Sequence, residues 1–375
     1  MRIALVVPGG VDRSGSVRVI PALLSLIERL AARHGVHVFA LRQEAGPGTW
    51  PLLGATVRNL GLPEHGFPGT GLLQGALRLA RGLADAGPFD VVHAFWAGTP
   101  AALAALATLR PRTPLVVHVA GGEVAALPEI GYGGFLHVRE RAKTRFALSR
   151  AVRVTCGSRF LQARLAAEDV TAEVIPLGVD PALFLAGPPT ARPPYRLLHV
   201  ASLSAVKDQP TLLRALRRVA DAGVDVALDV VGEDTLGGAV EREAARLGLE
   251  TRVTFQGFLP QAQLAPLVRK ADLFVQSSRW EAQGVAVLES AACGIPTVGT
   301  AVGLVADLAP AAAIAVPVGD EAALAEGILL LLRGEEKRLQ IGAAAREFAL
   351  AHDAGFTAGA FERIYEEIVS RRRSA

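Results

Sequence analysis

Short runs of apolar residues alternate along most of this chain with stretches in which apolar residues recur at helical spacing. The first run, Arg2–Val7, ends in Pro8-Gly9-Gly10, and apolar side chains then return every three or four positions between Ile20 and Ala31. An unbroken apolar run is typical of a strand buried on both faces of a parallel sheet. Further strands are predicted at 36–41, 90–94, 115–119, 152–155 and 173–175, and helices near 72–84, 101–109, 135–150 and 159–167.

The alternation stops at residues 187–194, GPPTARPP, which we interpret as a semi-rigid linker because proline sustains neither a helix nor a central strand. Strands then return at 196–201, 224–231, 253–255, 273–276 and 297–299, with helices near 212–220, 239–247, 261–270, 284–293, 321–332 and 335–370. The pattern predicts an α/β protein with two doubly wound, Rossmann-like domains. We expect them at 1–187 and 188–353, with a C-terminal helix at 354–375 crossing back to the first domain. A ligand cleft is expected between them, at the carboxyl ends of the strands.

Composition agrees with two folded domains. The chain has 375 residues, of which 51% are hydrophobic. This hydrophobic fraction is too high for a disordered chain. Lys and Arg number 39 against 36 Asp and Glu, a balance that argues against a dedicated nucleic-acid binder. The surplus is uneven, because residues 1–187 hold 19 basic and 13 acidic residues while 188–375 hold 20 and 23.

The expected location is the cytoplasm. Cys156 and Cys293 form neither a disulfide framework nor a CxxC pair, and the N-terminal apolar run is too short for a signal peptide. Residues 91–109 carry no charge, but Gly98 and Pro100 divide them, so a buried strand, turn and helix is expected there and not a membrane span.

The segment from Ser277 to Pro296 is the richest in candidate chemistry. It follows a predicted strand, and Gly284 would open a helix whose free N–H groups suit a phosphate. Glu281 precedes that helix and Glu289 lies inside it, so both carboxylates are predicted to face one ligand near the helix start. The alternative is a pair of ordinary surface glutamates.

WEAQGVAVLESAACGIPTVGT, with its E-x7-E pair, resembles the signature of the family 4 retaining glycosyltransferases of the GT-B fold. VIPLGVDPALF, HVASLSAVKDQPTLLRAL, VVGE and VTFQGFLP occur in family-like positions as well. The resemblance is strong over 152–308 and diffuse before that. It implies two Rossmann-like domains facing each other across a deep cleft.

The resemblance also implies roles for individual residues. Glu289 would bind the ribose hydroxyls of a nucleotide-sugar, Glu281 would approach the transferred sugar, and Lys207 would bind the diphosphate. Glu281 and Lys207 are the predicted catalytic residues. Further donor-binding residues are Ser202, Gly232, Phe258, Leu259, Arg279 and the amides of Gly284, Val285 and Ala286. Packing at a strand end is the alternative for Phe258 and Leu259, and a solvated lysine is the alternative for Lys207.

Several positions depart from the family pattern. Ser202, after Ala201, stands where an arginine is common, so Lys207 would act alone or with Arg279. Ala120 replaces a frequent histidine. Gln283 replaces a phenylalanine, and Leu304 and Asp307 replace a glycine and a glutamate. These departures suggest a subfamily with its own donor or acceptor, or weakened activity.

Candidate acceptor or cleft residues lie in the first domain. Gly10 and Gly15 belong to a glycine-rich loop after the first strand, which lacks the complete GxGxxG spacing of a dinucleotide site. His93 would face the acceptor or have a buried structural role. Glu123 would contact the sugar or acceptor, or lie on a loop surface. His118 is predicted to be a core histidine.

A basic stretch supplies much of the surplus charge. It contains Arg139, Arg141, Lys143, Arg145, Arg150 and Arg153. In related enzymes that glycosylate lipids, such a surface docks on anionic membranes, so a peripheral position on the inner face of the membrane is one expectation. A solvated helix face is the other.

We therefore expect a retaining, metal-independent glycosyltransferase that moves a hexose-type sugar to a hydroxyl acceptor. The donor would be a UDP-, GDP- or ADP-sugar and the acceptor a glycan, a lipid-linked glycan or a small molecule, with no cofactor, metal site or nucleic-acid partner. No D-x-D, HExxH, G-x-S-x-G or P-loop occurs. The alternatives are another GT-B enzyme, either a nucleotide-sugar epimerase or a phosphorylase, and a catalytically weak nucleotide-sugar-binding subunit. The oligomeric state stays open.

Overall fold

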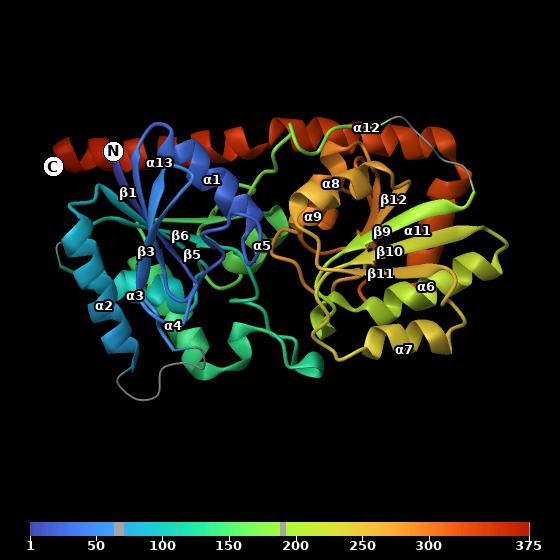
Figure 1. The fold of residues 1–375 in the computed structure, drawn as a ribbon, viewed down its shortest axis with the longest axis horizontal. Helices are drawn as coiled ribbons and strands as arrows, with labels where there is room; N and C mark the ends of the chain where they lie inside the picture. The colour runs from blue at the N-terminus through green and yellow to red at the C-terminus, as the bar shows by residue number, and fades with distance from the viewer. Residues whose placement is uncertain (64–70, 111, 188–192, 375) are drawn as a thin grey trace. The chain divides into compact units, whose positions relative to one another are not determined.

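Two β-sheets, one fully and one mostly composed of parallel strands, organise the chain in a computed structural model (Figure 1). The structure describes residues 1–63, 71–110, 112–187 and 193–374. One unit contains Met1–Leu177 together with Ala354–Ala375, and the other contains Gly178–Asp353. Residues 188–192 of the predicted linker lie outside the described residues.

The first unit is built on an eight-stranded sheet with the order β3-β4-β2-β1-β5-β6-β7-β8. Its pairings are parallel except that of β3 with β4. The strands are β1 (Arg2–Val7), β2 (Gly35–Ala40), β3 (Gly48–Leu52), β4 (Ala55–Asn59), β5 (Val91–Phe95), β6 (Leu115–Val119), β7 (Arg153–Cys156) and β8 (Glu173–Val174).

The sequence analysis missed the hairpin formed by β3 and β4. Each of these strands alternates buried with more exposed side chains, and Gly48 and Pro51 interrupt the apolar pattern of β3. Proline is tolerated there because β3 is an edge strand whose outer N–H groups need no ladder partner.

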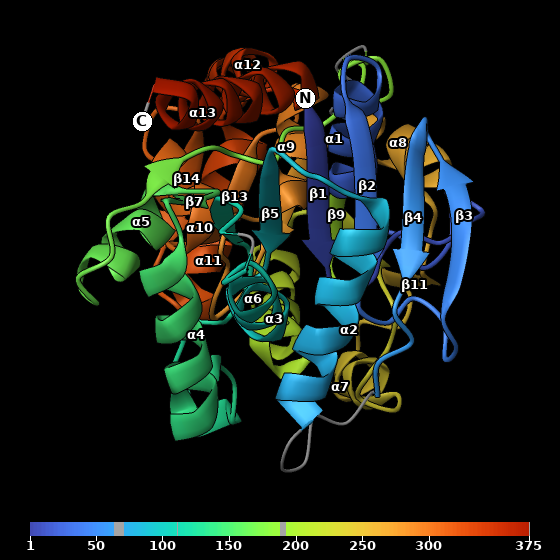
Figure 2. The ribbon, with the colours of Figure 1, turned by 90° about the vertical axis from the view of Figure 1, so that its left-hand side faces the viewer.

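Helices cover both faces of this sheet. Figures 1 and 2 show α1 (Pro21–Ala31) and α13 (Ala354–Ser374) on one face and α2 (Gly71–Ala86), α3 (Thr99–Ala107) and α4 (Val138–Arg150) on the other. The remaining helical elements are α5 (Arg159–Ala166) and the 3-10 turns η1 (Pro128–Ile130) and η2 (Gly134–Leu136). The last helix of the chain therefore packs with the first.

The second unit contains a fully parallel six-stranded sheet with the order β11-β10-β9-β12-β13-β14. Its strands are β9 (Tyr195–Val200), β10 (Val226–Val231), β11 (Val253–Gly257), β12 (Leu273–Gln276), β13 (Thr297–Thr300) and β14 (Ala313–Val316). Its helical elements are η3 (Ala205–Lys207), α6 (Gln209–Asp221), α7 (Ala239–Arg246), α8 (Gln261–Arg269), α9 (Val285–Ala292), α10 (Gly303–Leu308), α11 (Glu321–Arg333) and α12 (Glu335–Ala351). The sequence analysis missed β14 and α10, which are short, and it treated α12 and α13 as one stretch.

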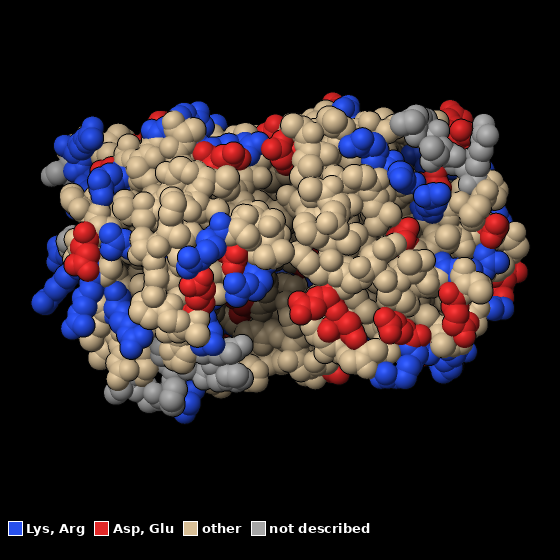
Figure 3. Space-filling view, viewed as in Figure 1, with Lys and Arg blue, Asp and Glu red and all other residues tan. Residues whose placement is uncertain are grey.

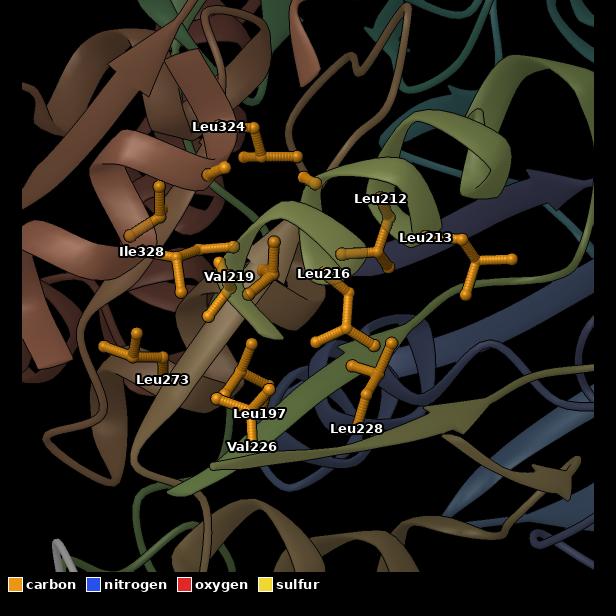
Figure 4. Packing of buried hydrophobic residues seen from close by; sticks show 14 of the residues in the cluster. Leu197, Leu212, Leu213, Leu216, Val219, Val226, Leu228, Leu273, Leu324 and Ile328 are labelled. Atoms are coloured by element: carbon orange, nitrogen blue, oxygen red, sulfur yellow. The ribbon is translucent and has the colours of Figure 1, made fainter. Parts of the chain in front are cut away.

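Alternate side chains of the central strands enter two apolar layers in this unit. Leu197 of β9 packs with Leu212, Leu216 and Val219 of α6 on one face (Figure 4). Its neighbour Leu198 belongs to a layer with α8, α9 and α12. Burial on both faces explains why two leucines, Leu197 and Leu198, follow each other at the centre of β9.

The second unit begins earlier than the predicted boundary at 187/188, because Gly178 is its first residue. Val179 and Phe184 are buried in the same apolar layer as Leu198. Apolar contacts therefore attach the segment after Leu177 to the second sheet, well before the proline-rich residues.

Strand order locates the ligand-binding edge of the second sheet. The order reverses between β9 and β12, which are adjacent in space although β10 and β11 follow β9 in sequence. Ligands of doubly wound sheets bind beyond the carboxyl ends of the strands at such a switch point. The loops after β9 and β12 carry Lys207 and Glu281.

Candidate active site

Lys207 and Glu281 meet at the switch point of the second sheet. The Lys207 ammonium Nζ lies 2.5 Å from Glu281 Oε1, and the Ser278 hydroxyl donates a hydrogen bond of 2.7 Å to the same oxygen. Both charged side chains are largely but not completely buried, with 22% and 13% of their surface exposed. The site thus pairs a cation with a carboxylate that still reaches solvent.

Several bonds hold the two loops together around this pair. The Arg279 amide donates to the Val206 carbonyl at 2.7 Å, and the Ser277 hydroxyl donates to the Lys207 carbonyl at 2.8 Å. Arg279 Nε also lies 3.0 Å from Asp208 Oδ2. Arg279, which was one of the two alternatives for completing the cationic site, thus pairs with Asp208 in this structure.

Helix α9 starts beside this pair, as predicted. Gly284 precedes the first residue of α9 with φ +90°, a conformation that favours glycine. A Cβ atom added at this position would lie 3.1 Å from Gln276 Oε1. The N–H groups of Val285 and Ala286 belong to the first turn, where amides have no intrahelical acceptor. The helix start therefore offers N–H groups and a partial positive charge to an anion.

Glu289 lies inside α9 and is almost completely buried, with 6% of its surface exposed. Gln261 at the start of α8 donates a hydrogen bond of 2.9 Å to its Oε1. Burial raises the pKa of Glu289 to about 7, although the bond from Gln261 opposes the rise. A carboxylate in this setting gains from hydroxyl donors that a ligand brings.

The remaining candidates in the second unit follow neighbouring strands. Gly232 follows β10 and has φ +151°. A Cβ atom added there would lie only 1.9 Å from the Ala201 carbonyl oxygen, so any side chain would separate the ends of β9 and β10. Phe258, after β11, is 54% exposed, whereas Leu259 packs on the apolar layer of α8 and α9. Ser202 is exposed, and its carbonyl accepts a bond from Gln209.

In the first unit, the carboxylate of Glu123 binds backbone amides. It accepts hydrogen bonds from Ala97 at 2.9 Å, Ala120 at 3.2 Å and Gly121 at 2.6 Å. Burial raises the pKa of Glu123, and these amide bonds oppose the rise. Glu123 was expected either to contact a sugar or acceptor or to lie on a loop surface. In the structure its side chain links the loops that follow β5 and β6.

His93 has the buried role that was one of its two predicted alternatives, and the acceptor-facing alternative does not fit. Its exposed surface is 0%, and its Nδ1 lies 2.6 Å from the Tyr365 hydroxyl of α13. The ring stacks on Phe95, with 4.3 Å between centroids. Desolvation holds the pKa of His93 well below its usual range, so the ring is neutral. His118 is a core histidine as well, 2.9 Å from Thr155 Oγ1.

The glycine-rich loop after β1 is closed by its own contacts. The Gly10 carbonyl accepts a bond of 2.9 Å from the Ile20 amide, and the Gly15 amide donates to the Asp12 carbonyl at 3.0 Å. Asp12 Oδ2 also pairs with Arg18 Nη2 at 2.5 Å. Bonds from Ser14, first of all from its backbone amide, keep the pKa of Asp12 below its usual range.

The basic stretch on and after α4 contains several ion pairs. Arg145 and Arg141 lie 2.6 and 3.2 Å from Glu168, and Lys143 lies 2.6 Å from Glu140. Carboxylates therefore partly neutralise this surface. On the face shown in Figure 3, basic and acidic side chains are interspersed over much of each unit, while basic ones gather near the end of α13.

Three partners of the candidate residues were missed in the sequence. They are Ser278, which bonds to Glu281, Gln261, which bonds to Glu289, and Asp208, which pairs with Arg279. Ser278 and Asp208 adjoin predicted site residues in sequence and could have been suspected. Gln261 had no such signal, because it lies 28 positions from Glu289.

Comparisons with known proteins identify the family to which the chain belongs. Residues 19–178 match the family described as "Glycosyl transferase 4-like domain", and residues 188–348 match "Glycosyl transferases group 1". The chain is 30% identical over 153 residues to N-acetyl-alpha-D-glucosaminyl L-malate synthase of Bacillus anthracis, an alignment covering 40% of this chain and 39% of that enzyme. The matched region is thus less than half of that relative's length.

Two other similar proteins cover nearly the whole chain. Phosphatidyl-myo-inositol mannosyltransferase of Mycobacterium leprae is 27% identical, with 99% of this chain and 98% of that protein aligned. The crystal structure of Anabaena HepE in complex with UDP and glucose has a TM-score of 0.76 and 20% identity, over 97% of this chain and 99% of that one. The second likeness concerns the fold alone. Two family matches in succession along the chain, together with this fold, show that the chain belongs to the family 4 glycosyltransferases of the GT-B type.

Proposed function

We propose that this protein is a retaining glycosyltransferase that moves a hexose-type sugar from a nucleotide diphosphate-sugar to a hydroxyl acceptor without a metal ion. The observation that carries the proposal is the contact between Lys207 and Glu281 at the switch point of the second sheet, beside the start of α9. This arrangement supplies a cation for a diphosphate and a carboxylate for sugar hydroxyls within one small site.

Each donor group has a matching group of the protein. Lys207 and the first amides of α9 would bind the diphosphate, whose negative charge grows as the sugar leaves. Glu289 would accept hydrogen bonds from the ribose, and Glu281 from hydroxyls of the transferred sugar. Phe258 and Leu259 would line the base pocket. Binding of ribose to Glu289 would replace the hydration that burial has removed from its carboxylate.

The reaction would break the bond between the anomeric carbon and the diphosphate oxygen through an oxocarbenium-like state. The acceptor oxygen would form its bond on the same face of the sugar, and its proton would pass to the leaving diphosphate. No protein base is required by this scheme, and the charge of Lys207 would stabilise the leaving group.

The acceptor is proposed to be a glycan, a lipid-linked glycan or a small molecule. The chain is similar over its full length to a protein named as a phosphatidyl-myo-inositol mannosyltransferase, which supports a lipid-linked acceptor. Peripheral contact with an anionic membrane is proposed as part of that alternative. Within the described residues, no helix combines the length and the apolar character that a membrane crossing requires.

The test is a thermal-shift screen of the full chain against UDP-, GDP- and ADP-sugars, followed by transfer assays with the best donor. Product anomeric configuration by NMR and activity in a chelator test retention and metal independence. Transfer with retention and full activity in the chelator is the expected result. Phosphorolysis of a glycoside, or epimerisation of the donor, would identify another type of GT-B enzyme. Donor binding without turnover over an acceptor panel would indicate a binding subunit.

A further inference from the structure

A buried histidine and a buried glutamine lie directly behind the Lys207 loop. His199 is on β9 and Gln209 is the first residue of α6, and each has 1% of its surface exposed. His199 Nδ1 lies 2.9 Å from the Val275 carbonyl of β12, and its Nε2 lies 3.2 Å from Gln209 Nε2. The same amide nitrogen donates to the Ser202 carbonyl at 3.0 Å.

The neighbouring carbonyls determine how these groups are oriented. The Ser202 carbonyl only accepts, so the NH2 of Gln209 and not its oxygen must face it. The Val275 carbonyl only accepts as well, so His199 must carry its proton on Nδ1. The Nε2 lone pair of His199 then accepts the second N–H of Gln209, so both N–H groups of Gln209 are used, while its Oε1 is buried without a hydrogen-bond partner among the described residues.

This series joins the two loops that carry the candidate catalytic pair. Val275 is on β12, whose loop leads to Glu281, and Ser202 lies in the loop that leads from β9 to Lys207. Neutral His199 suits the arrangement, because a proton on Nε2 would face the NH2 of Gln209. Burial holds the pKa of His199 at about 4, so the ring is neutral near pH 7.

We propose that Gln209 and His199 are positioning residues that hold the β9 loop so that the Lys207 ammonium stays where it binds a nucleoside diphosphate. This inference rests on the proposed function. Gln209 acts through the Ser202 carbonyl and never touches the ligand. Its contribution to binding is therefore transmitted through Lys207.

The test is a double-mutant cycle with Gln209→Met, which keeps the length of the side chain and removes both N–H groups. Binding of UDP, GDP and ADP to the full chain is measured by calorimetry, alone and in a Lys207→Gln background. We expect about tenfold weaker diphosphate binding in the native background, equivalent to about one hydrogen bond, and almost no further loss in the Lys207→Gln background. Gln340→Met, at an exposed position of α12, is the matched control and should bind as the native chain does.

The outcomes separate the inference from the function on which it rests. Equal losses in both backgrounds, or no loss in either, would overturn the positioning role and leave the proposed function standing. Binding of none of the three diphosphates by the native chain would overturn both. If Gln209→Met does not fold, as judged by circular dichroism, Gln209→Asn carries the same cycle, because the shorter amide no longer spans His199 and Ser202.

Discussion

The Lys207 ammonium and the Glu281 carboxylate are 2.5 Å apart although 74 positions separate them in the sequence. Each charge compensates the other. A diphosphate entering the site would compete with Glu281 for Lys207, and a sugar hydroxyl would then donate to the released carboxylate. On the proposed function, the pair would therefore couple binding of the two halves of a nucleotide-sugar donor.

Replacing Lys207 by glutamine should weaken nucleoside diphosphate binding about 10- to 100-fold, because a charge-assisted hydrogen bond contributes about 1.5–3 kcal/mol. Binding of the parent nucleoside should be unchanged, since it has no phosphate. Calorimetric titration measures both. Lys270→Gln, at an exposed position after α8, is the control, and an equal loss in that variant would remove the special role of Lys207.

Replacing Glu289 by glutamine should stabilise the fold above pH 7 and weaken donor binding. Burial raises the pKa of Glu289 from 4.5 to about 7, so the folded state retains a proton that the unfolded chain has lost. Stability contributed by this residue is thus present below about pH 4.5 and is lost as pH rises to about 7, by about 3 kcal/mol. The neutral amide of the Glu289→Gln variant cannot ionise and avoids this loss.

Chemical denaturation of both proteins at pH 5 and pH 8 measures the difference, with Glu326→Gln at an exposed position of α11 as the control. The loss of a ribose acceptor should reduce donor affinity about 10- to 100-fold in the same variant. Unchanged donor affinity would refute the ribose role, and an equal pH dependence in both proteins would refute the burial argument.

Replacing Tyr365 by phenylalanine should destabilise the first unit and leave nucleotide binding intact. The hydroxyl is the partner of His93 Nδ1 at 2.6 Å, and its loss leaves a buried ring nitrogen without that partner, at a cost of about 1–3 kcal/mol. Denaturant midpoints report the stability. Tyr195→Phe, at a partly exposed position of β9, should change little. An unaltered midpoint for Tyr365→Phe would show that the His93 contact contributes nothing.

Replacing Glu123 by glutamine should loosen the loops after β5 and β6. Two carboxylate oxygens accept N–H groups from Ala97, Ala120 and Gly121, whereas a glutamine offers one acceptor oxygen and an opposing NH2. Hydrogen exchange at those three amides should accelerate, and the free energy of unfolding should fall by about 1–3 kcal/mol. Glu173→Gln, exposed on β8, provides the comparison. Unchanged exchange rates of these amides in Glu123→Gln would contradict the role of Glu123 in holding the two loops.

Much of the fold follows from local patterns. Arg2–Val7, Leu115–Val119 and Leu273–Gln276 form strands with the predicted limits, because each is mostly apolar and almost wholly buried. The hairpin of β3 and β4 escaped prediction because an edge of the sheet needs only one buried face. The second unit starts at Gly178 and not at the predicted residue 188, because Val179 and Phe184 pack on a layer made mostly of residues that come much later in the sequence.

Sequence alone determined the alternation of strands and helices, the two-sheet organisation and the family resemblance, since these depend on residue types at short spacings. Only the tertiary structure decided which side chains meet. Lys207 joins Glu281, Gln261 joins Glu289, and Tyr365 of the last helix joins His93 of β5. The first pair forms because the sheet order brings distant loops to one edge, and the other two form because α8 packs on α9 and α13 packs on β5. Burial then sets the charge state of Glu289 and His93.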